Sequence, residues 1–148
     1  MFVKDVLVPN PLIVGPETSV QEFCMKVLDS NQTTAVVVAE DGRMLGMVSV
    51  HDVFDRIVPH YVDLKGHLAE VVRDDYFDEK FDEMRHVAVR DLMNEDIHTL
   101  APEDSVLKAI ALFSSAHHKT APIVDAAGKF LGTITRRSVL SRVTGKTS

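Results

Sequence analysis

The chain contains two short stretches whose residue types are suited to binding a ligand. Residues 46–52 read GMVSVHD, and residues 132–138 read GTITRRS. Each stretch runs from a glycine through apolar residues to a hydroxyl residue, but the first ends in the carboxylate of Asp52 and the second in Ser138. A carboxylate accepts charge-assisted hydrogen bonds, which are stronger than the neutral bonds of a serine. We therefore expect the two stretches to differ in what they bind.

The same spacing also has a structural interpretation. Ser49 and Asp52 stand three residues apart, as in a capping box, in which the N-cap hydroxyl and the side chain at N3 each bind a backbone N–H. Thr135 and Ser138 repeat this spacing. Both stretches are expected to open a helix, and this capping role does not exclude a ligand-binding one.

The other reactive side chains do not suggest a catalytic or metal site. His117 and His118 are adjacent, so their side chains do not converge on one face of a strand or helix. No carboxylate or thiolate spacing completes a known zinc site, and the chain has neither a glycine-rich phosphate loop nor a nucleophile elbow. The single cysteine, Cys24, lies in an apolar-periodic stretch and is expected to be a small core residue. The sequence thus predicts no metal and no enzymatic activity.

Composition limits the classes of partner. Of the 148 residues, 45% are hydrophobic, and the formal net charge is −6, with acidic residues gathered at 70–83. Nucleic-acid binding relies on Lys and Arg to neutralise phosphates, so this balance argues against it. No apolar run approaches the roughly 18–20 residues of a membrane span, and the first ten residues do not resemble a signal peptide. We expect a cytoplasmic protein with no nucleic-acid or membrane partner.

An internal repeat is the most informative feature of the sequence. At a gapless offset of 86 residues, VKDVLVPNPLIVGPETSV at 3–20 aligns with VRDLMNEDIHTLAPEDSV at 89–106. In the same register, TAVVVAEDGRMLGMVS at 34–49 aligns with TAPIVDAAGKFLGTIT at 120–135. The chain therefore contains two copies of one structural unit.

The repeat divides the chain into three parts. We expect a first unit at 1–58, a helical acidic connector at 59–88 and a second unit at 89–148. A unit of this size has a marginal core, so the two copies should pack against each other. In the connector, VDLKGHLAEVV and YFDEKFDEM have helical apolar spacing, which predicts one or two amphipathic helices. Their apolar face is expected to cover the paired units or to meet another chain.

Each unit is predicted to run strand, helix, strand, strand, helix. Thr18 or Ser19 can cap the first helix, and the Asp-Gly pair at Gly42 predicts a hairpin that Gly128 repeats. The hydroxyl residues at 49 and 135 then open the second helix. Apolar residues at helical spacing mark the first helix of both units: Val20, Phe23, Cys24, Val27 and Leu28 in one, and Val106, Ala109, Ile110 and Phe113 in the other. The second helices have Val53, Phe54 and Ile57, and Val139, Leu140 and Val143.

The order and spacing of these segments resemble a CBS domain pair, the regulatory Bateman module. The resemblance rests on VKDVLVPNP, VRDLMNED, TAPIVD and the two glycine-hydroxyl stretches, and it fails only over the connector. It implies an α/β (α+β) fold of tandem β-α-β-β-α units with pseudo-two-fold symmetry and two clefts between the sheets. In this family the clefts commonly bind adenosine-containing ligands, and the module carries out no chemistry of its own.

The resemblance also implies ligand-binding roles for particular residues. In the family motif the acid binds ribose hydroxyls, and basic residues before the second strand reach the phosphates. A nucleotide with its ribose at Asp52 would direct its phosphate toward Lys119. The residues expected in this better site are Ser49, Val50, His51, Asp52, His118, Lys119 and Thr120.

The second cleft is expected to be weaker, empty or altered in specificity, because Ser138 replaces the acid. Arg136 and Arg137 could turn this cleft toward phosphate. The residues expected in this weaker site are Thr34, Thr135, Arg136, Arg137 and Ser138.

The resemblance favours a stand-alone regulatory module that senses AMP, ADP, ATP or S-adenosylmethionine and signals to an effector protein. The adenosyl compound would be a regulatory ligand, and no catalytic cofactor is expected. A homodimer is expected from the family. The alternative is a structural adaptor that dimerises through its helices and binds no ligand.

Overall fold

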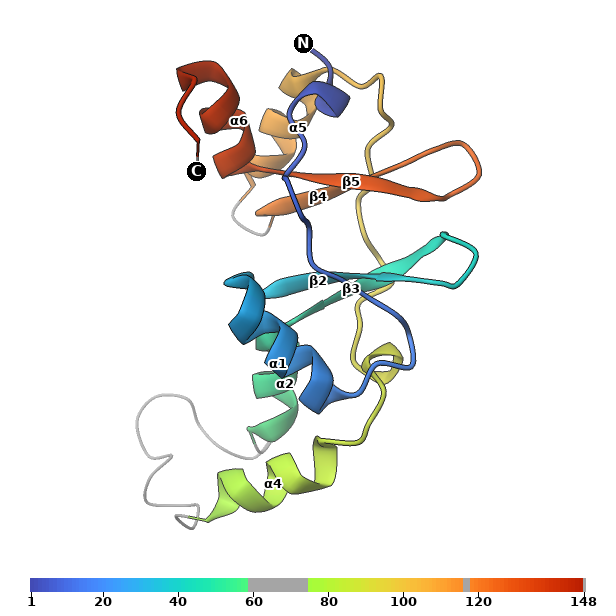
Figure 1. The fold of residues 1–148 in the computed structure, drawn as a ribbon, viewed down its shortest axis with the longest axis vertical. Coiled ribbons are helices and arrows are strands. Elements are labelled where there is room, and N and C mark those ends of the chain that lie inside the picture. Colours follow the sequence, from blue (N-terminus) through green and yellow to red (C-terminus); the bar gives the residue numbers. More distant parts are fainter. Residues whose placement is uncertain (59–74, 116–117, 148) are drawn as a thin grey trace.

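A computed structural model of the chain describes residues 1–58, 75–115 and 118–147. The described residues form two similar halves, each with a β-hairpin and two helices (Figure 1). The two hairpins lie next to each other in the middle of the molecule, and the helices cover their outer faces. This is the mixed α/β arrangement of tandem units that the sequence predicts.

The elements of the first half follow the predicted order. They are β1 (Ile13–Val14), α1 (Val20–Ser30), β2 (Thr34–Val38), β3 (Met44–Ser49) and α2 (Val50–Ile57). Ser19 caps α1, since its hydroxyl accepts a hydrogen bond from the Glu22 N–H at 3.1 Å. The β2–β3 turn contains Gly42 at φ 91°, a left-handed conformation that glycine adopts at no steric cost. The predicted hairpin and helix start are both confirmed.

The second half repeats this order, with one shortened element. It contains α5 (Val106–Phe113), β4 (Thr120–Val124), β5 (Phe130–Thr135) and α6 (Arg136–Thr144). Its first strand is reduced to a single bridge between Leu100 and Ile123. In the first half the Val36 N–H donates to the Leu12 carbonyl at 2.9 Å, but the equivalent residue of the second half is Pro122, which has no N–H to donate. The proline therefore explains the shorter pairing.

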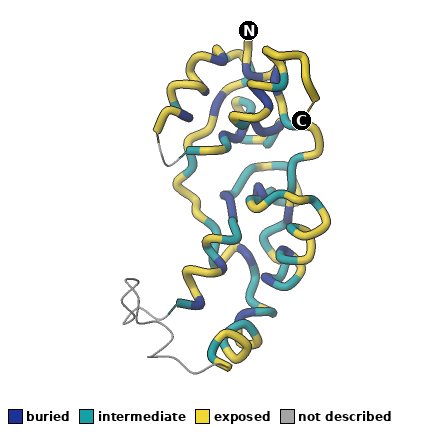
Figure 2. Tube along the Cα trace, turned by 90° about the vertical axis from the view of Figure 1, so that its left-hand side faces the viewer, coloured by how far each residue is buried: buried dark blue, intermediate teal, exposed yellow. Residues whose placement is uncertain are grey.

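The opening residues of each repeat pack against the other half. Val3 and Val6 belong to the core formed by α5, β4 and β5, whereas Val89 belongs to the core formed by α1, β2 and β3. The short 3₁₀ helices at Val3–Asp5 and Val89–Asp91 are thus exchanged between the halves. The two units that follow one another in the sequence therefore do not coincide with the two cores of the structure. Figure 2 shows these cores as two buried interiors along the long axis.

Equivalent hydrogen bonds hold the two exchanged segments. The Val3 N–H donates to the Asp104 carbonyl at 2.9 Å, and the Val89 N–H donates to the Thr18 carbonyl at 2.8 Å. Both pairs are related by the sequence offset of the repeat. The offset thus relates contacts between the halves as well as contacts within them. The exchanged segments therefore obey the same pseudo-two-fold symmetry as the rest of the fold.

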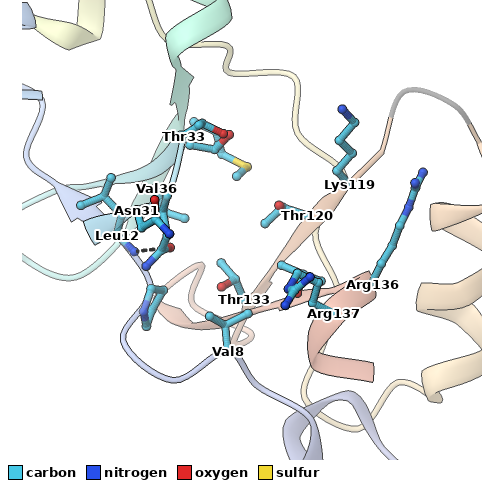
Figure 3. Close-up of a pocket in the computed structure, with 15 residues that line it drawn as sticks. Val8, Leu12, Asn31, Thr33, Val36, Lys119, Thr120, Thr133, Arg136 and Arg137 are labelled. Atoms are coloured by element: carbon cyan, nitrogen blue, oxygen red, sulfur yellow. Dashed lines mark hydrogen bonds between the residues drawn. The ribbon is translucent and has the colours of Figure 1, made fainter. Parts of the chain in front are cut away.

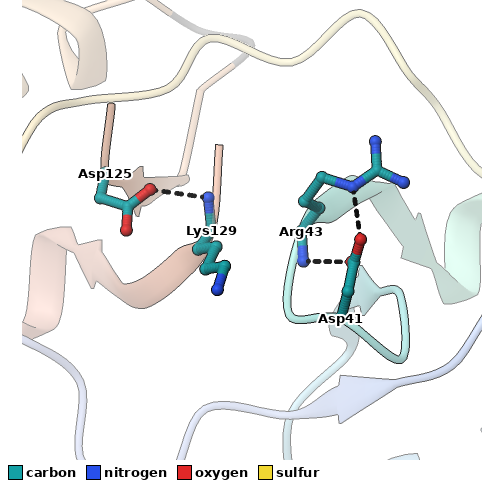
Figure 4. Close-up of polar contacts among 4 residues, drawn as sticks. All are labelled: Asp41, Arg43, Asp125 and Lys129. Carbon is teal, nitrogen blue, oxygen red and sulfur yellow. Dashed lines mark hydrogen bonds and ion pairs between the residues drawn. The ribbon is translucent and has the colours of Figure 1, made fainter. Parts of the chain in front are cut away.

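The turn ends of the two hairpins are joined directly. Met44 N–H donates to the Gly128 carbonyl at 3.0 Å, and Phe130 N–H donates to the Gly42 carbonyl at 2.9 Å. Beside this junction the backbone N–H and the guanidinium of Arg43 bind Asp41 (Figure 4), and these bonds hold the pKa of Asp41 below its ordinary value. Backbone pairing therefore fixes how the two halves sit against each other.

Several apolar residues at the predicted helical spacing are exposed. Leu28 is 83% exposed on α1, and Ile110 is 42% exposed on α5. On the second helices, Phe54, Leu140 and Val143 are each more than half exposed as well. Helical periodicity identifies an apolar face correctly, but the sheet beneath covers only part of that face.

The second connector helix is confirmed as α4 (Tyr76–Met84). Met84 is 6% exposed and joins the core of the first half, and the rings of Phe77 and Phe81 stack with their centroids 6.0 Å apart. The described part of the connector therefore covers its own chain. The segment VDLKGHLAEVV, predicted as a helix, lies outside the described residues.

Candidate functional site

Two cavities lie where the hairpins of the two halves meet. One has a volume of about 640 Å³ and contains Asp52, and the other has a volume of about 380 Å³ and contains Arg137. Both volumes fall in the range of small-molecule sites. Each cavity takes residues from both halves, so neither half forms a complete site alone.

The larger cavity, here called the Asp52 cavity, brings together every residue that the sequence assigned to the better site. Four come from the end of β3 and the first turn of α2, and three come from the start of β4 and the residues before it. They are Ser49, Val50, His51, Asp52, His118, Lys119 and Thr120. The strand-to-helix junction of one half therefore faces the incoming strand of the other.

Asp52 uses one carboxylate oxygen to cap its own helix. Its Oδ2 accepts hydrogen bonds from the backbone N–H of Ser49 at 2.8 Å and from the Ser49 hydroxyl at 3.0 Å, and the Asp52 N–H donates back to Ser49 Oγ at 3.3 Å. The capping box predicted at this position is present. Oδ1 accepts no hydrogen bond from the described residues, so this oxygen is available to a ligand hydroxyl.

The equivalent capping box of the second half engages the Ser138 hydroxyl both as a donor and as an acceptor. Its hydroxyl accepts from the Thr135 N–H at 2.9 Å and donates to the Thr135 carbonyl at 3.0 Å, while the Ser138 N–H donates to Thr135 Oγ1 at 3.1 Å. Ser138 is 9% exposed and does not line either cavity. The structure therefore separates Ser138 from the site to which the sequence assigned it.

The smaller cavity, here called the Arg137 cavity, contains the other four residues of the predicted weaker site: Thr34, Thr135, Arg136 and Arg137 (Figure 3). Arg136 and Arg137 are the first two residues of α6, and Thr34 begins β2. The Arg136 guanidinium donates to the Phe113 carbonyl at 3.1 Å and to the His118 carbonyl at 3.4 Å. Arg137 makes no hydrogen bond or ion pair with the described residues.

Each cavity also has a wall that the sequence reasoning missed. Asn94, Asp96, Ile97 and His98 line the Asp52 cavity. The corresponding segment of the first repeat supplies Val8, Pro11 and Leu12 to the Arg137 cavity. These residues follow the exchanged 3₁₀ helices. Val8 bonds to Thr133 and Asn94 to Met47 of the opposite half, whereas Leu12 already bonds to Val36 of its own half. The two walls are related by the offset of the repeat, so the repeat could have identified them from the sequence.

Two histidines meet at the Asp52 cavity. The rings of His98 and His118 pack edge to face, with centroids 5.1 Å apart and an interplanar angle of 88°. His98 comes from the missed wall and His118 from the predicted set, so this contact joins the two parts of the lining. Such a pair offers both an aromatic edge and nitrogen atoms to a ligand.

Five residues line both cavities: Thr33, Thr34, Met47, Lys119 and Thr120. Lys119 is the only cation among them, and it makes no hydrogen bond or ion pair with the described residues. The two cavities therefore share a wall, and one ammonium group serves both.

Cys24 lines neither cavity. Cys24 is half-buried on α1, and burial raises the pKa of its thiol, which disfavours the reactive thiolate. Within residues 1–58, 75–115 and 118–147, no three His, Cys, Asp or Glu side chains are grouped so as to hold a metal ion. None of the helices in the described ranges combines the length and apolar character required to cross a membrane.

Comparison with known proteins agrees with the symmetry of the structure. The family model of the CBS domain matches residues 3–59 and again residues 89–145. The uncharacterized protein MJ1426 of Methanocaldococcus jannaschii is 23% identical over 95% of this chain and 89% of its own length.

Two solved structures with bound small molecules share the fold. CBSX2, a CBS-pair protein of Arabidopsis thaliana, was solved in complex with AMP; it is 21% identical over 97% of this chain and 96% of its own, with a TM-score of 0.74. The CBS domain pair of protein MJ0100 was solved with 5′-methylthioadenosine and S-adenosyl-L-methionine. It is 17% identical over 99% of this chain and 98% of its own, with a TM-score of 0.68.

Proposed function

Because this chain belongs to the CBS domain family and contains the domain twice, we propose that it is a regulatory module that binds an adenosine-containing ligand in the Asp52 cavity. The ligand class comprises AMP, ADP, ATP and S-adenosylmethionine. The module would act as a sensor and would carry out no catalysis.

The observation that carries this proposal is the geometry of Asp52. Its Oδ2 is occupied by the helix cap, which fixes the side chain, while Oδ1 is left for a ligand. A fixed carboxylate oxygen with two lone pairs can accept hydrogen bonds from both hydroxyls of a ribose. The capping and ligand-binding roles of Asp52 are therefore compatible.

The rest of the Asp52 cavity suits the other parts of a nucleotide. The cavity has room for a ligand of this size, and Lys119 lies in its lining without an ion-pair partner among the described residues. A ribose held at Asp52 would place a phosphate toward Lys119. The AMP complex of CBSX2 and the S-adenosyl-L-methionine complex of MJ0100 support an adenosyl ligand for this fold.

Sensing requires that the ligand bind two states of the protein with different affinity. The Asp52 cavity is formed by both halves, so a ligand in it would favour one relative position of the halves over another. The exposed apolar side chains of α1, α2, α5 and α6 suggest a surface for a second copy or for an effector protein. We propose a cytoplasmic homodimer that passes this change to such an effector.

The same apolar surface supports the second candidate function. A structural adaptor would use these helices to dimerise and would leave both cavities without a ligand. Leu107 at 71% exposed and Leu140 at 60% exposed favour dimerisation under either function, so the two candidates differ only in ligand binding.

Isothermal titration calorimetry of ligand-free protein with AMP, ATP and S-adenosylmethionine separates the candidates. We expect saturable binding of at least one of the three compounds. If none produces heat while circular dichroism shows the folded protein, and if equilibrium dialysis also detects no binding, the adaptor function replaces the sensor.

A further inference from the structure

The Arg137 cavity differs from the Asp52 cavity in charge as well as in size. The Asp52 cavity has two carboxylates in its lining, Asp52 and Asp96. Among the described residues that line the Arg137 cavity there is no carboxylate, whereas Lys119, Arg136 and Arg137 are all present. Because low-dielectric walls focus the field of like charges, such a cavity attracts anions.

The three cations of this cavity are not equivalent. Arg136 is held by the carbonyls of Phe113 and His118, and in Figure 3 its side chain runs away from Leu12 and Val36 on the opposite wall. Arg137 and Lys119 make no hydrogen bond or ion pair with the described residues. These two groups can therefore bind an anion without breaking an existing contact.

Threonine hydroxyls and two side-chain amides supply further polar groups. Thr34, Thr120, Thr133 and Thr135 line the cavity from β2, β4 and β5, and Asn31, Gln32 and Thr33 line it from the residues before β2. A threonine hydroxyl can donate to a phosphate oxygen, and an arginine guanidinium can donate two parallel bonds to it. The residue that would have bound a ribose, at position 138, is turned into its own helix cap and does not reach the cavity.

We propose that the Arg137 cavity is a separate anion site that binds a compact phosphate compound, such as a pyrophosphate group, without requiring a ribose. The polyanion binds between Arg137 and Lys119, with the threonine hydroxyls donating to its remaining oxygens. The site is thus specific for charge, whereas the Asp52 cavity is specific for a diol. This inference does not depend on what binds at Asp52.

The test is a calorimetric titration with inorganic pyrophosphate of the wild-type chain, of Arg137→Gln and of Arg142→Gln. Arg142 lies on the same helix, is exposed and lines neither cavity, so its replacement is a matched control for a lost positive charge. We expect the wild type and Arg142→Gln to bind alike and Arg137→Gln to bind at least about tenfold more weakly, as the loss of charged hydrogen bonds implies.

Three outcomes would overturn the proposal: no pyrophosphate binding by the wild type, unchanged binding by Arg137→Gln, or an equal loss in Arg142→Gln. A titration with adenosine, which has a ribose but no phosphate, tests the site further. Displacement of pyrophosphate by adenosine would also contradict the proposal. Failure of AMP, ATP and S-adenosylmethionine alike to bind the wild type would count against the sensor function and leave the pyrophosphate result intact. Circular dichroism of each variant establishes that the fold is retained.

Discussion

Asp52 binds the backbone N–H of Ser49 at 2.8 Å through the same oxygen that accepts the Ser49 hydroxyl. One carboxylate oxygen thus opens helix α2, and the other is left without a partner among the described residues. In the second half, Ser138 has only one side-chain oxygen, and the helix cap engages that oxygen both as a donor and as an acceptor. The acid at this position therefore leaves a whole carboxylate oxygen outside the helix cap, whereas the serine side chain has no second oxygen to leave.

Replacing Asp52 by Asn should weaken AMP binding by about tenfold or more. The amide oxygen can still cap α2, but the charged acceptor is lost, and hydrogen bonds to charged groups contribute about 1.5–3 kcal/mol. Ser138→Ala is the matched control at the equivalent position and should leave AMP affinity unchanged. Isothermal titration calorimetry measures both, and an equal loss in the two variants would contradict the assignment of ribose binding to Asp52.

Lys119 should couple the two cavities, because it lines both. In the wild type we expect pyrophosphate to weaken AMP binding severalfold, and AMP to weaken pyrophosphate binding by the same factor, as linkage requires. In Lys119→Gln both ligands should bind more weakly, but each should lose most of its effect on the other. AMP titrations at several pyrophosphate concentrations measure this factor. An undiminished factor in the variant would show that Lys119 does not carry the coupling.

Gly46→Ala should destabilise the protein more than Gly132→Ala, although the two glycines are equivalent in the repeat. A Cβ at Gly46 would lie 2.6 Å from the Asn94 carbonyl oxygen, whereas at Gly132 it would meet the flexible side chain of Leu7 at 3.2 Å. Overpacking against a backbone costs about 1–3 kcal/mol, but Leu7 is 37% exposed and can move aside. Urea denaturation compares the variants, and equal stabilities would contradict the close approach at Gly46.

Asp104 should make the stability depend on pH in the acidic range. The Ala101 N–H at 2.8 Å and then the Lys108 ammonium at 3.1 Å hold the pKa of Asp104 below its ordinary value. A lowered folded-state pKa means that this stabilisation is complete above about pH 4 and is lost as the pH falls through the folded-state pKa. The thermal unfolding midpoint of Asp104→Asn should therefore lie below that of the wild type at pH 7, and this difference should shrink near pH 2. A constant difference would exclude the linkage.

Leu107→Glu should reduce self-association if the exposed helices form a dimer interface. Leu107 is 71% exposed on α5, so a charge there costs little in the single chain but would be buried between two chains. Ala126→Glu, on the exposed β4–β5 turn, is the control. Analytical ultracentrifugation at several concentrations measures the association, and a monomeric wild type would refute the proposed homodimer.

The sequence was sufficient to predict a structural feature wherever the interaction that determines the feature is local. The capping boxes at Ser49 and Thr135 each span three residues, and the hairpin turns depend on single glycines, so the repeat pattern contains the information needed for both. Because the capping boxes sit at the strand-to-helix junctions that face the cavities, the residues predicted around Asp52 lie together in one cavity.

The sequence was insufficient where a non-local contact decides the outcome. His98 lines the Asp52 cavity and follows a segment that packs on the opposite half, and periodicity within one repeat says nothing about that exchange. Likewise, Leu28 has the correct spacing for a core residue, but the adjoining sheet does not extend over it. The absent N–H of Pro122 is visible in the sequence, and it could have predicted the shortened strand.

The exchange of the opening segments bears on how such a chain can arise by duplication. A half-length molecule would contain an opening segment, but in the arrangement seen here that segment would complete the core of a second molecule and not its own. Two such molecules would then share both cavities from the start, with identical residues in each. Joining them in one chain allows the two copies to diverge, which is how an acid at 52 and a serine at 138 can coexist in one symmetric frame.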